Sequence, residues 1–173
     1  MLEIGKVQDK QAPILRGAEV VALLSASNWK EEAVLTRGDV SWNLRSRKNK
    51  RLIGALSTDP DISDTGEQAR FLAEQTSWWR GTWDITLEGL RYTLSPKSIW
   101  RGTHRIERSG QEVAVSGTVG TWSPRVTLEA TDSVPLDHQL FLLWMAFILN
   151  RRASSTATTG AIAGGAAAAA GSS

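Results

Sequence analysis

The feature that most constrains the fold is an unbroken apolar run of ten residues, LFLLWMAFIL, at positions 140–149. Pro135 and Asp137 stand just before it, where a proline fits the first helical turn and a carboxylate faces the positive end of the helix dipole. Two arginines follow it, where cations complement exposed carbonyls. The run therefore predicts a helix at about residues 136–150. Because its apolar side chains point in every direction, this helix has to be enclosed on every side.

The length of the run decides what encloses the helix. A membrane span needs about 20 apolar residues, whereas runs of about 10–14 are typical of buried core helices. Ten residues therefore favour a helix buried in protein. A short membrane anchor built on residues 136–149 stays open as an alternative. Burial of ten such side chains would contribute at most about 15–30 kcal/mol before the entropy cost of folding.

Most of the chain before this helix alternates apolar and polar residues. The segments 40–44, 83–87 and 113–115 alternate in this way, and turns containing glycine or asparagine separate such segments. A period of two is typical of half-buried strands, and short strands at regular spacing predict an antiparallel meander. The apolar group at residues 20–24 is interpreted as a further strand.

Three other segments are assigned from local signals. Thr65 and Gln68 have the spacing of a capping box, which predicts a short extra helix near residues 66–75. Residues 1–12 are polar and unpatterned, and we expect a loose lead-in there. Residues 153–173 are almost entirely Ala, Gly, Ser and Thr, a composition that predicts a disordered tail.

The meander and the helix together predict a mainly β fold. A helix with its side chains is about 10–12 Å across, and the interior of a barrel widens with its number of strands. A barrel of roughly 10–12 antiparallel strands is wide enough to close around the C-terminal helix. We therefore expect one barrel domain over residues 13–152 with the helix as its core.

Two features resemble the tubby-like barrel superfamily, which includes the tubby C-terminal domain, the LURP-one-related proteins and the phospholipid scramblases. The sequences WRGTWDITLEGLRYTL and HRIERSGQEVAVSG are similar to its hairpins, and VPLDHQLFLLWMAFILNRR is similar to its terminal helix, which threads the barrel. The resemblance implies a barrel around a helix over residues 13–152. Tubby domains bind phosphoinositide headgroups through basic side chains, and scramblases are palmitoylated on cysteine. Neither property transfers residue by residue, because the basic positions do not match and this chain has no cysteine.

Composition limits the chemistry that the chain can perform. Without cysteine, disulfides, thiol catalysis and cysteine-ligated metals are excluded, and only His104 and His138 supply imidazoles. The sequence contains no nucleophile elbow, glycine-rich phosphate loop or zinc spacing. We expect a non-enzymatic protein without cofactor or metal. The net charge of +2 does not predict nucleic-acid binding. The segment MLEIGKVQDK lacks the apolar core of a secretory signal, so we expect a cytoplasmic location, peripheral at the membrane if lipid is bound.

The strongest charge feature is RSRKNKR at the first predicted hairpin turn. It contains Arg45, Arg47, Lys48, Lys50 and Arg51. Such a cluster can bind phosphate groups or an anionic membrane surface, each charge adding about 1 kcal/mol. A charged hairpin tip is also common as a solvated turn that prevents aggregation. The hypothesis is a binding or membrane-tethering domain that recognises anionic lipid headgroups. A protein partner and a small-molecule carrier barrel are the alternatives, and the oligomeric state stays open.

Two aromatic and two imidazole side chains are weaker candidates. Trp78 and Trp79 could anchor the protein at a membrane interface. If they lie in a strand, adjacent side chains point to opposite faces, so we expect one in the core and one at the rim. His138 is expected at the mouth of the barrel in contact with water, and His104 either buried and hydrogen-bonded or exposed.

Overall fold

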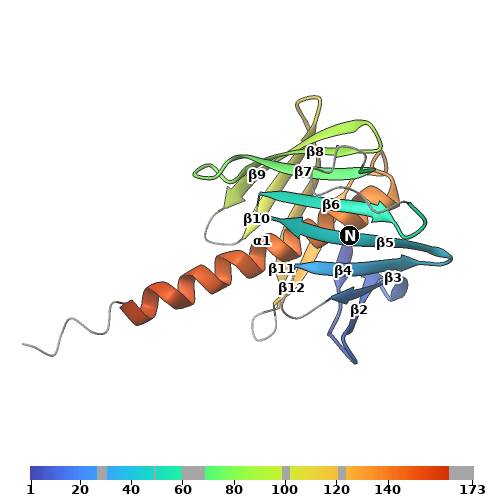
Figure 1. Ribbon diagram of the computed structural model, residues 1–173, viewed down its shortest axis with the longest axis horizontal. Coiled ribbons are helices and arrows are strands. Elements are labelled where there is room, and N and C mark those ends of the chain that lie inside the picture. The colour runs from blue at the N-terminus through green and yellow to red at the C-terminus, as the bar shows by residue number, and fades with distance from the viewer. Residues whose placement is uncertain (27–30, 49, 60–68, 99–101, 121–123, 164–173) are drawn as a thin grey trace, which may run out of the picture.

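The computed structural model is a closed barrel of twelve antiparallel strands with one helix, α1 (Leu136–Ala163). Each strand pairs with the next one along the chain, and β1 pairs with β12 to close the ring (Figure 1). The predicted mainly β barrel with a C-terminal helix is confirmed. The structure describes residues 1–26, 31–48, 50–59, 69–98, 102–120 and 124–163. The strands are β1 (Leu2–Ile4), β2 (Gln11–Arg16), β3 (Glu19–Ala26), β4 (Glu32–Arg37), β5 (Val40–Arg47), β6 (Arg51–Leu56), β7 (Phe71–Ser77), β8 (Thr82–Leu87), β9 (Leu90–Ser98), β10 (Thr103–Arg108), β11 (Gln111–Val119) and β12 (Arg125–Ala130).

The strands form where apolar residues alternate with polar ones, because every strand has one face toward the interior and one toward solvent. In β5, Trp42 and Leu44 are buried, while Asn43, Arg45 and Arg47 remain partly exposed. Tight turns join the strands. Glu88 and Gly89 have φ values of 47° and 83°, the left-handed conformation of both central residues in the hairpin turn that suits twisted strands.

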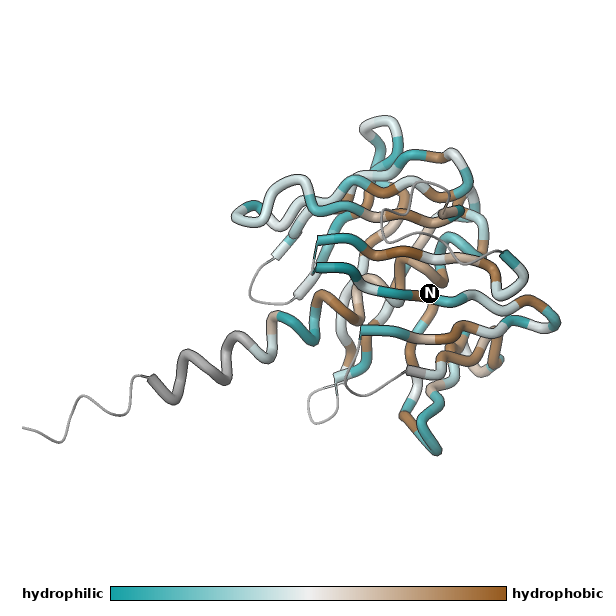
Figure 2. The backbone as a smooth tube through the Cα atoms, viewed as in Figure 1, coloured by the Kyte–Doolittle hydropathy of each residue, from teal (hydrophilic) through white to brown (hydrophobic). Residues whose placement is uncertain are grey.

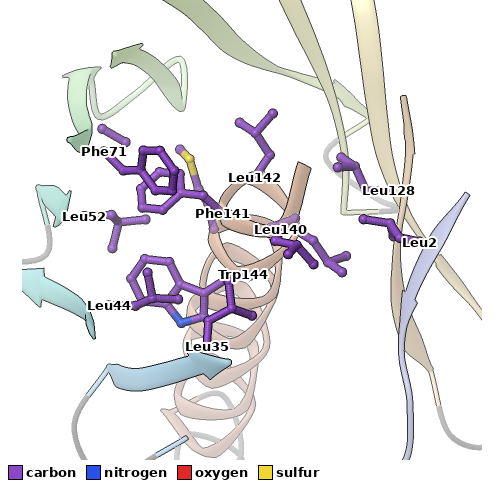
Figure 3. Close-up of a cluster of buried hydrophobic side chains, with 14 of the residues drawn as sticks. Leu2, Leu35, Leu44, Leu52, Phe71, Leu128, Leu140, Phe141, Leu142 and Trp144 are labelled. Carbon is purple, nitrogen blue, oxygen red and sulfur yellow. The ribbon is translucent and has the colours of Figure 1, made fainter. Parts of the chain in front are cut away.

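The core lies between α1 and the inner faces of the strands. Residues 140–146 of α1 are at most 1% exposed. Figure 3 shows Leu35, Leu44, Leu52 and Phe71 on one side of the helix and Leu2 and Leu128 on the other. The helix is apolar where the barrel surrounds it and hydrophilic where it leaves (Figure 2). The barrel therefore supplies the enclosure that the apolar run requires. Within the described residues, no helix combines the length and hydropathy that a membrane span needs.

The first twelve residues are not a loose lead-in. Leu2 and Ile4 are 1% and 5% exposed, and β1 pairs with both β12 and β2. The expectation was wrong because three residues are too few to show a period. The strand is defined by partners that are distant in sequence, and no local pattern reports them.

Residues 71–77 form β7 and not part of a helix. Phe71 faces the core, and the strand pairs with β6 and β8. The predicted helix near 66–75 is therefore wrong over these residues, because pairing on both sides outweighs a weak local capping signal. Thr65 and Gln68, which suggested the cap, lie outside the described residues.

The helix is longer than predicted. It begins at Leu136 as expected but continues to Ala163, so residues 153–163 are helical where a disordered tail was expected. Alanine is the best helix former, and four of these eleven residues are alanine. The hydroxyl of Ser154 donates to the carbonyl oxygen of Asn150 one turn earlier, at 3.0 Å. Residues 164–173 of the predicted tail lie outside the described residues.

Candidate functional site

The two ends of the barrel carry different sets of turns. Because the strands alternate in direction, the turns that follow β2, β4, β6, β8, β10 and β12 lie at one end, where α1 begins. We call this the entry end. The turns that follow β1, β3, β5, β7, β9 and β11 lie at the other end, where α1 leaves the barrel, and we call this the exit end. Figure 1 shows the helix emerging on the side of the β5–β6 and β7–β8 turns.

At the entry end, side chains from the strands hold the first turn of α1. Arg37 donates two hydrogen bonds to Asp137, at 2.7 and 2.9 Å. His138 is 1% exposed, with its Nδ1 atom 3.0 Å from the Tyr92 hydroxyl and its Nε2 atom 3.4 Å from Glu88. Burial lowers the pKa of His138. A neutral ring can accept a hydrogen bond from the tyrosine hydroxyl at one nitrogen and donate its N–H to the carboxylate at the other. The expectation that His138 contacts water was wrong, because the ring is buried and both of its nitrogens meet protein groups.

At the exit end, Arg152 fixes α1 to the wall. Its guanidinium donates to both carboxylate oxygens of Glu31, one at 2.8 Å, and to the hydroxyl of Ser46 at 2.9 Å. The hydrogen bond from Arg152 lowers the pKa of the Glu31 carboxyl. Together with the entry-end contacts, this bond holds the helix at both ends of the segment that fills the barrel.

The three arginines of the predicted basic cluster lie in strands on the outer wall. Arg47 approaches Glu32 of β4 at 3.5 Å, and Arg51 approaches Glu74 of β7 at 2.6 Å. Arg45 is in register with Glu32 and lines an open groove with it. These arginines therefore lie among carboxylates of the neighbouring strands, which reduces the charge that they offer to a ligand.

The two lysines of the cluster lie in the β5–β6 turn at the exit end. Lys48 and Lys50 are both exposed, and Lys48 has a left-handed φ of 49°. Among the described residues, no carboxylate forms an ion pair with either lysine. The structure therefore divides the five predicted residues into three wall arginines and two exposed turn lysines. Their binding role stays a prediction.

The adjacent tryptophans lie in the β7–β8 turn and not in a strand. Trp78 and Trp79 are 81% and 68% exposed, so the expectation that one of them is buried was wrong. The Arg80 guanidinium lies 4.5 Å from the centre of the Trp79 ring. The backbone amide of Gln75, in the last part of β7, donates to the Lys50 carbonyl oxygen at 2.8 Å, which joins the β5–β6 turn to β7 at the exit end. Sequence analysis missed Arg80, although the glycine after it signals a turn.

Charge is distributed unevenly between the two ends. In the described turns of the exit end, five cations face two carboxylates. In those of the entry end, four carboxylates face one cation. The exit-end residues are Lys6, Lys10, Lys48, Lys50 and Arg80 with Asp9 and Glu31, and the entry-end residues are Asp39, Asp59, Glu88 and Asp132 with Arg70. Although the net charge is near neutral, the described turns are therefore positive at the exit end and negative at the entry end.

One serine–histidine pair has the residue types of a nucleophile and a base. The Nδ1 atom of His104 lies 3.1 Å from the hydroxyl of Ser116, and the His104 amide donates to the same oxygen at 3.2 Å. Ser116 has no exposed surface, and burial lowers the pKa of His104 to about 4. A hydroxyl without access to solvent cannot reach a substrate, so this contact is structural. The part of the chain that the structure describes contains no group of three or more potential metal ligands.

No family model, curated protein or solved structure matches this chain. The resemblance to tubby-like barrels stays a prediction.

Proposed function

We propose that the protein is a non-enzymatic domain that binds the surface of an anionic phospholipid membrane with the exit end of its barrel. Lys48 and Lys50 carry this proposal, because both are exposed and neither pairs with a carboxylate of the described residues. Their turn lies at the end where cations outnumber carboxylates. A peripheral position on the cytoplasmic face of a membrane follows from this reading.

The opposite charges of the two ends support a defined orientation of the barrel on an anionic membrane as well as its attraction to that membrane. An anionic surface attracts the lysines at the exit end and repels the carboxylates at the entry end. Each lysine near such a surface adds about 1 kcal/mol. Arg47 and Arg51 contribute less, because Glu32 and Glu74 already partly neutralise them.

The filled interior supports binding on the outside of the barrel. Side chains of α1 occupy the space in which a carrier barrel would hold its ligand, with Phe141 and Trp144 fully enclosed. The surface at the exit end is the end of the barrel where positive charge of the described turns gathers.

Vesicle binding tests the proposal. We expect the full chain to bind phosphatidylcholine vesicles that contain phosphatidylserine, not to bind vesicles without it, and to dissociate as salt is raised. Lys48→Ala/Lys50→Ala should weaken binding about 30-fold, from about 1 kcal/mol for each lysine.

The matched control is Arg16→Ala/Arg91→Ala. It removes the same charge from exposed positions close to the entry end, and we expect it to bind like the unchanged chain. Equal losses in the two variants, or binding that is insensitive to salt, would contradict the proposal. Competition by inorganic phosphate as effective as that of vesicles would show that a soluble anion is the ligand.

A further inference from the structure

We propose that Trp78 and Trp79 insert into the interface between headgroups and acyl chains when the exit end docks on a membrane. This inference rests on the proposed function. It adds an apolar anchor to a contact otherwise made by charge.

The exposure of the pair is the first argument. The other tryptophans whose side chains the structure describes, Trp42, Trp83 and Trp144, are at most 2% exposed. Two adjacent indoles in water form an apolar patch that contributes nothing to the core. Such patches on soluble proteins mark interaction surfaces. Tryptophan in particular gathers at membrane interfaces, because its ring is apolar and its N–H group is polar.

The shape of the tip favours a membrane over a protein partner. The β7–β8 turn projects from the barrel on the side where α1 leaves (Figure 1). A stable protein interface buries about 800 Å² on each partner, much more than a four-residue tip presents. Insertion into an interface needs only a projecting apolar tip beside cations. Arg80 provides such a cation on the Trp79 ring, and Lys50 lies in the neighbouring β5–β6 turn, where its carbonyl oxygen accepts a hydrogen bond from the backbone of Gln75 in β7.

The turn is held in shape before it meets any ligand. The Arg80 amide donates to the hydroxyl of Ser77 at 3.3 Å, and Thr76 donates to the carbonyl oxygen of Thr82 at 3.2 Å. Gly81 has a φ of 64°, which other residues rarely adopt, and a Cβ there would lie 3.0 Å from Pro96. Arg80 also covers one face of the Trp79 ring. Insertion would therefore require little ordering of the tip.

Partitioning of tryptophan variants onto phosphatidylserine-containing vesicles provides the first test. Trp78→Ala/Trp79→Ala should bind about tenfold more weakly, with an unchanged dependence on salt. Lys48→Ala/Lys50→Ala should instead make the dependence on salt shallower. The control Val20→Ala/Leu23→Ala truncates exposed apolar residues of the outer wall and should bind like the unchanged chain. Because all of these side chains are exposed, thermal melting should show folded variants.

Labelling provides the second test, and the absence of cysteine makes it direct. A fluorophore on Trp78→Cys should shift to shorter wavelength on vesicles and be quenched by lipids that carry a quencher in the upper acyl chain. The same label on Asp39→Cys, in an exposed entry-end turn, should not change.

The outcomes separate the two proposals. Unchanged binding of the tryptophan variant, or a label at position 78 that stays in water while the protein is bound, overturns insertion. Equal, tryptophan-dependent binding to neutral and anionic vesicles supports insertion and overturns electrostatic recognition. Absence of binding to any vesicle overturns both.

Discussion

Both histidines are used as neutral hydrogen-bonding groups in the structure. His138 connects Tyr92 to Glu88 where α1 begins, and His104 connects to Ser116 across β10 and β11. Burial lowers the pKa of each ring, so protonation opposes the folded state. The histidines therefore contribute to stability and make it depend on pH.

His104 should make the protein less stable in mild acid. Its pKa falls from 6.5 to about 4 on folding, so the unfolded state binds more protons between these values. The free energy of unfolding is unaffected by this pKa shift above pH 6.5. It decreases as the pH falls toward about 4, by at most about 3 kcal/mol. Urea unfolding at neutral pH and near pH 4 measures this loss of stability. The loss should be smaller in His104→Asn, which can still form a hydrogen bond with Ser116, than in the unchanged chain. An identical loss in both proteins would contradict this role.

The tryptophan pair shows what residue-level analysis of the sequence could and could not predict. Its membrane-anchoring potential follows from residue type alone. Its exposure depends on whether residues 78 and 79 belong to a strand or a turn, because in a strand one of them would be buried. Gly81 is the local signal for the turn. The proximity of Lys50 could not be predicted, because it follows from the pairing of β6 with β7.

At the level of elements, α1 is the core of the barrel and is fixed at both ends. Asp137 binds Arg37 at the entry end, and Arg152 binds Glu31 at the exit end. Between them the helix contacts strands that are far apart in sequence. Folding of the barrel and burial of the helix should therefore be one cooperative event.

Truncation inside α1 should be costly only where the barrel surrounds it. Leu142→Ala, at a side chain with no exposed surface, should lower the free energy of unfolding by about 2–5 kcal/mol. Ser154→Ala, on the exposed part of the same helix, should change it by less than about 0.5 kcal/mol. Urea denaturation of both variants measures the difference. Similar values for the two sites would show that the helix is not part of the core.

The helix and most strands could be predicted where their sequence signals are local. The apolar run 140–149 was enough to predict a buried helix, and alternation was enough to predict most of the strands. β1 and β7 were missed because their partners, and not their own sequences, determine them. The end of α1 was missed because residues 153–163 have no apolar face and their alanines stand among serine, threonine and glycine, which favour a helix less.

At the level of the whole molecule, the two ends of the barrel carry charge of opposite sign. Among the described residues, the exit end carries the exposed turn lysines and tryptophans, and the entry end carries most of the turn carboxylates. The helix that fills the interior leaves the ends and the outer wall for binding. We propose that these features together orient the molecule with its exit end toward an anionic surface, which the net charge of only +2 does not predict.

Backbone hydrogen exchange with and without phosphatidylserine-containing vesicles tests this orientation most directly, in the unchanged chain. We expect slower exchange on vesicles in the exit-end turns at residues 48–50 and 78–81. The entry-end turns at residues 38–39, 88–89 and 109–110 should exchange at the same rate in both conditions. Protection at the entry end, or protection of neither end while the protein is bound, would contradict the proposal that the exit end is the membrane-binding surface.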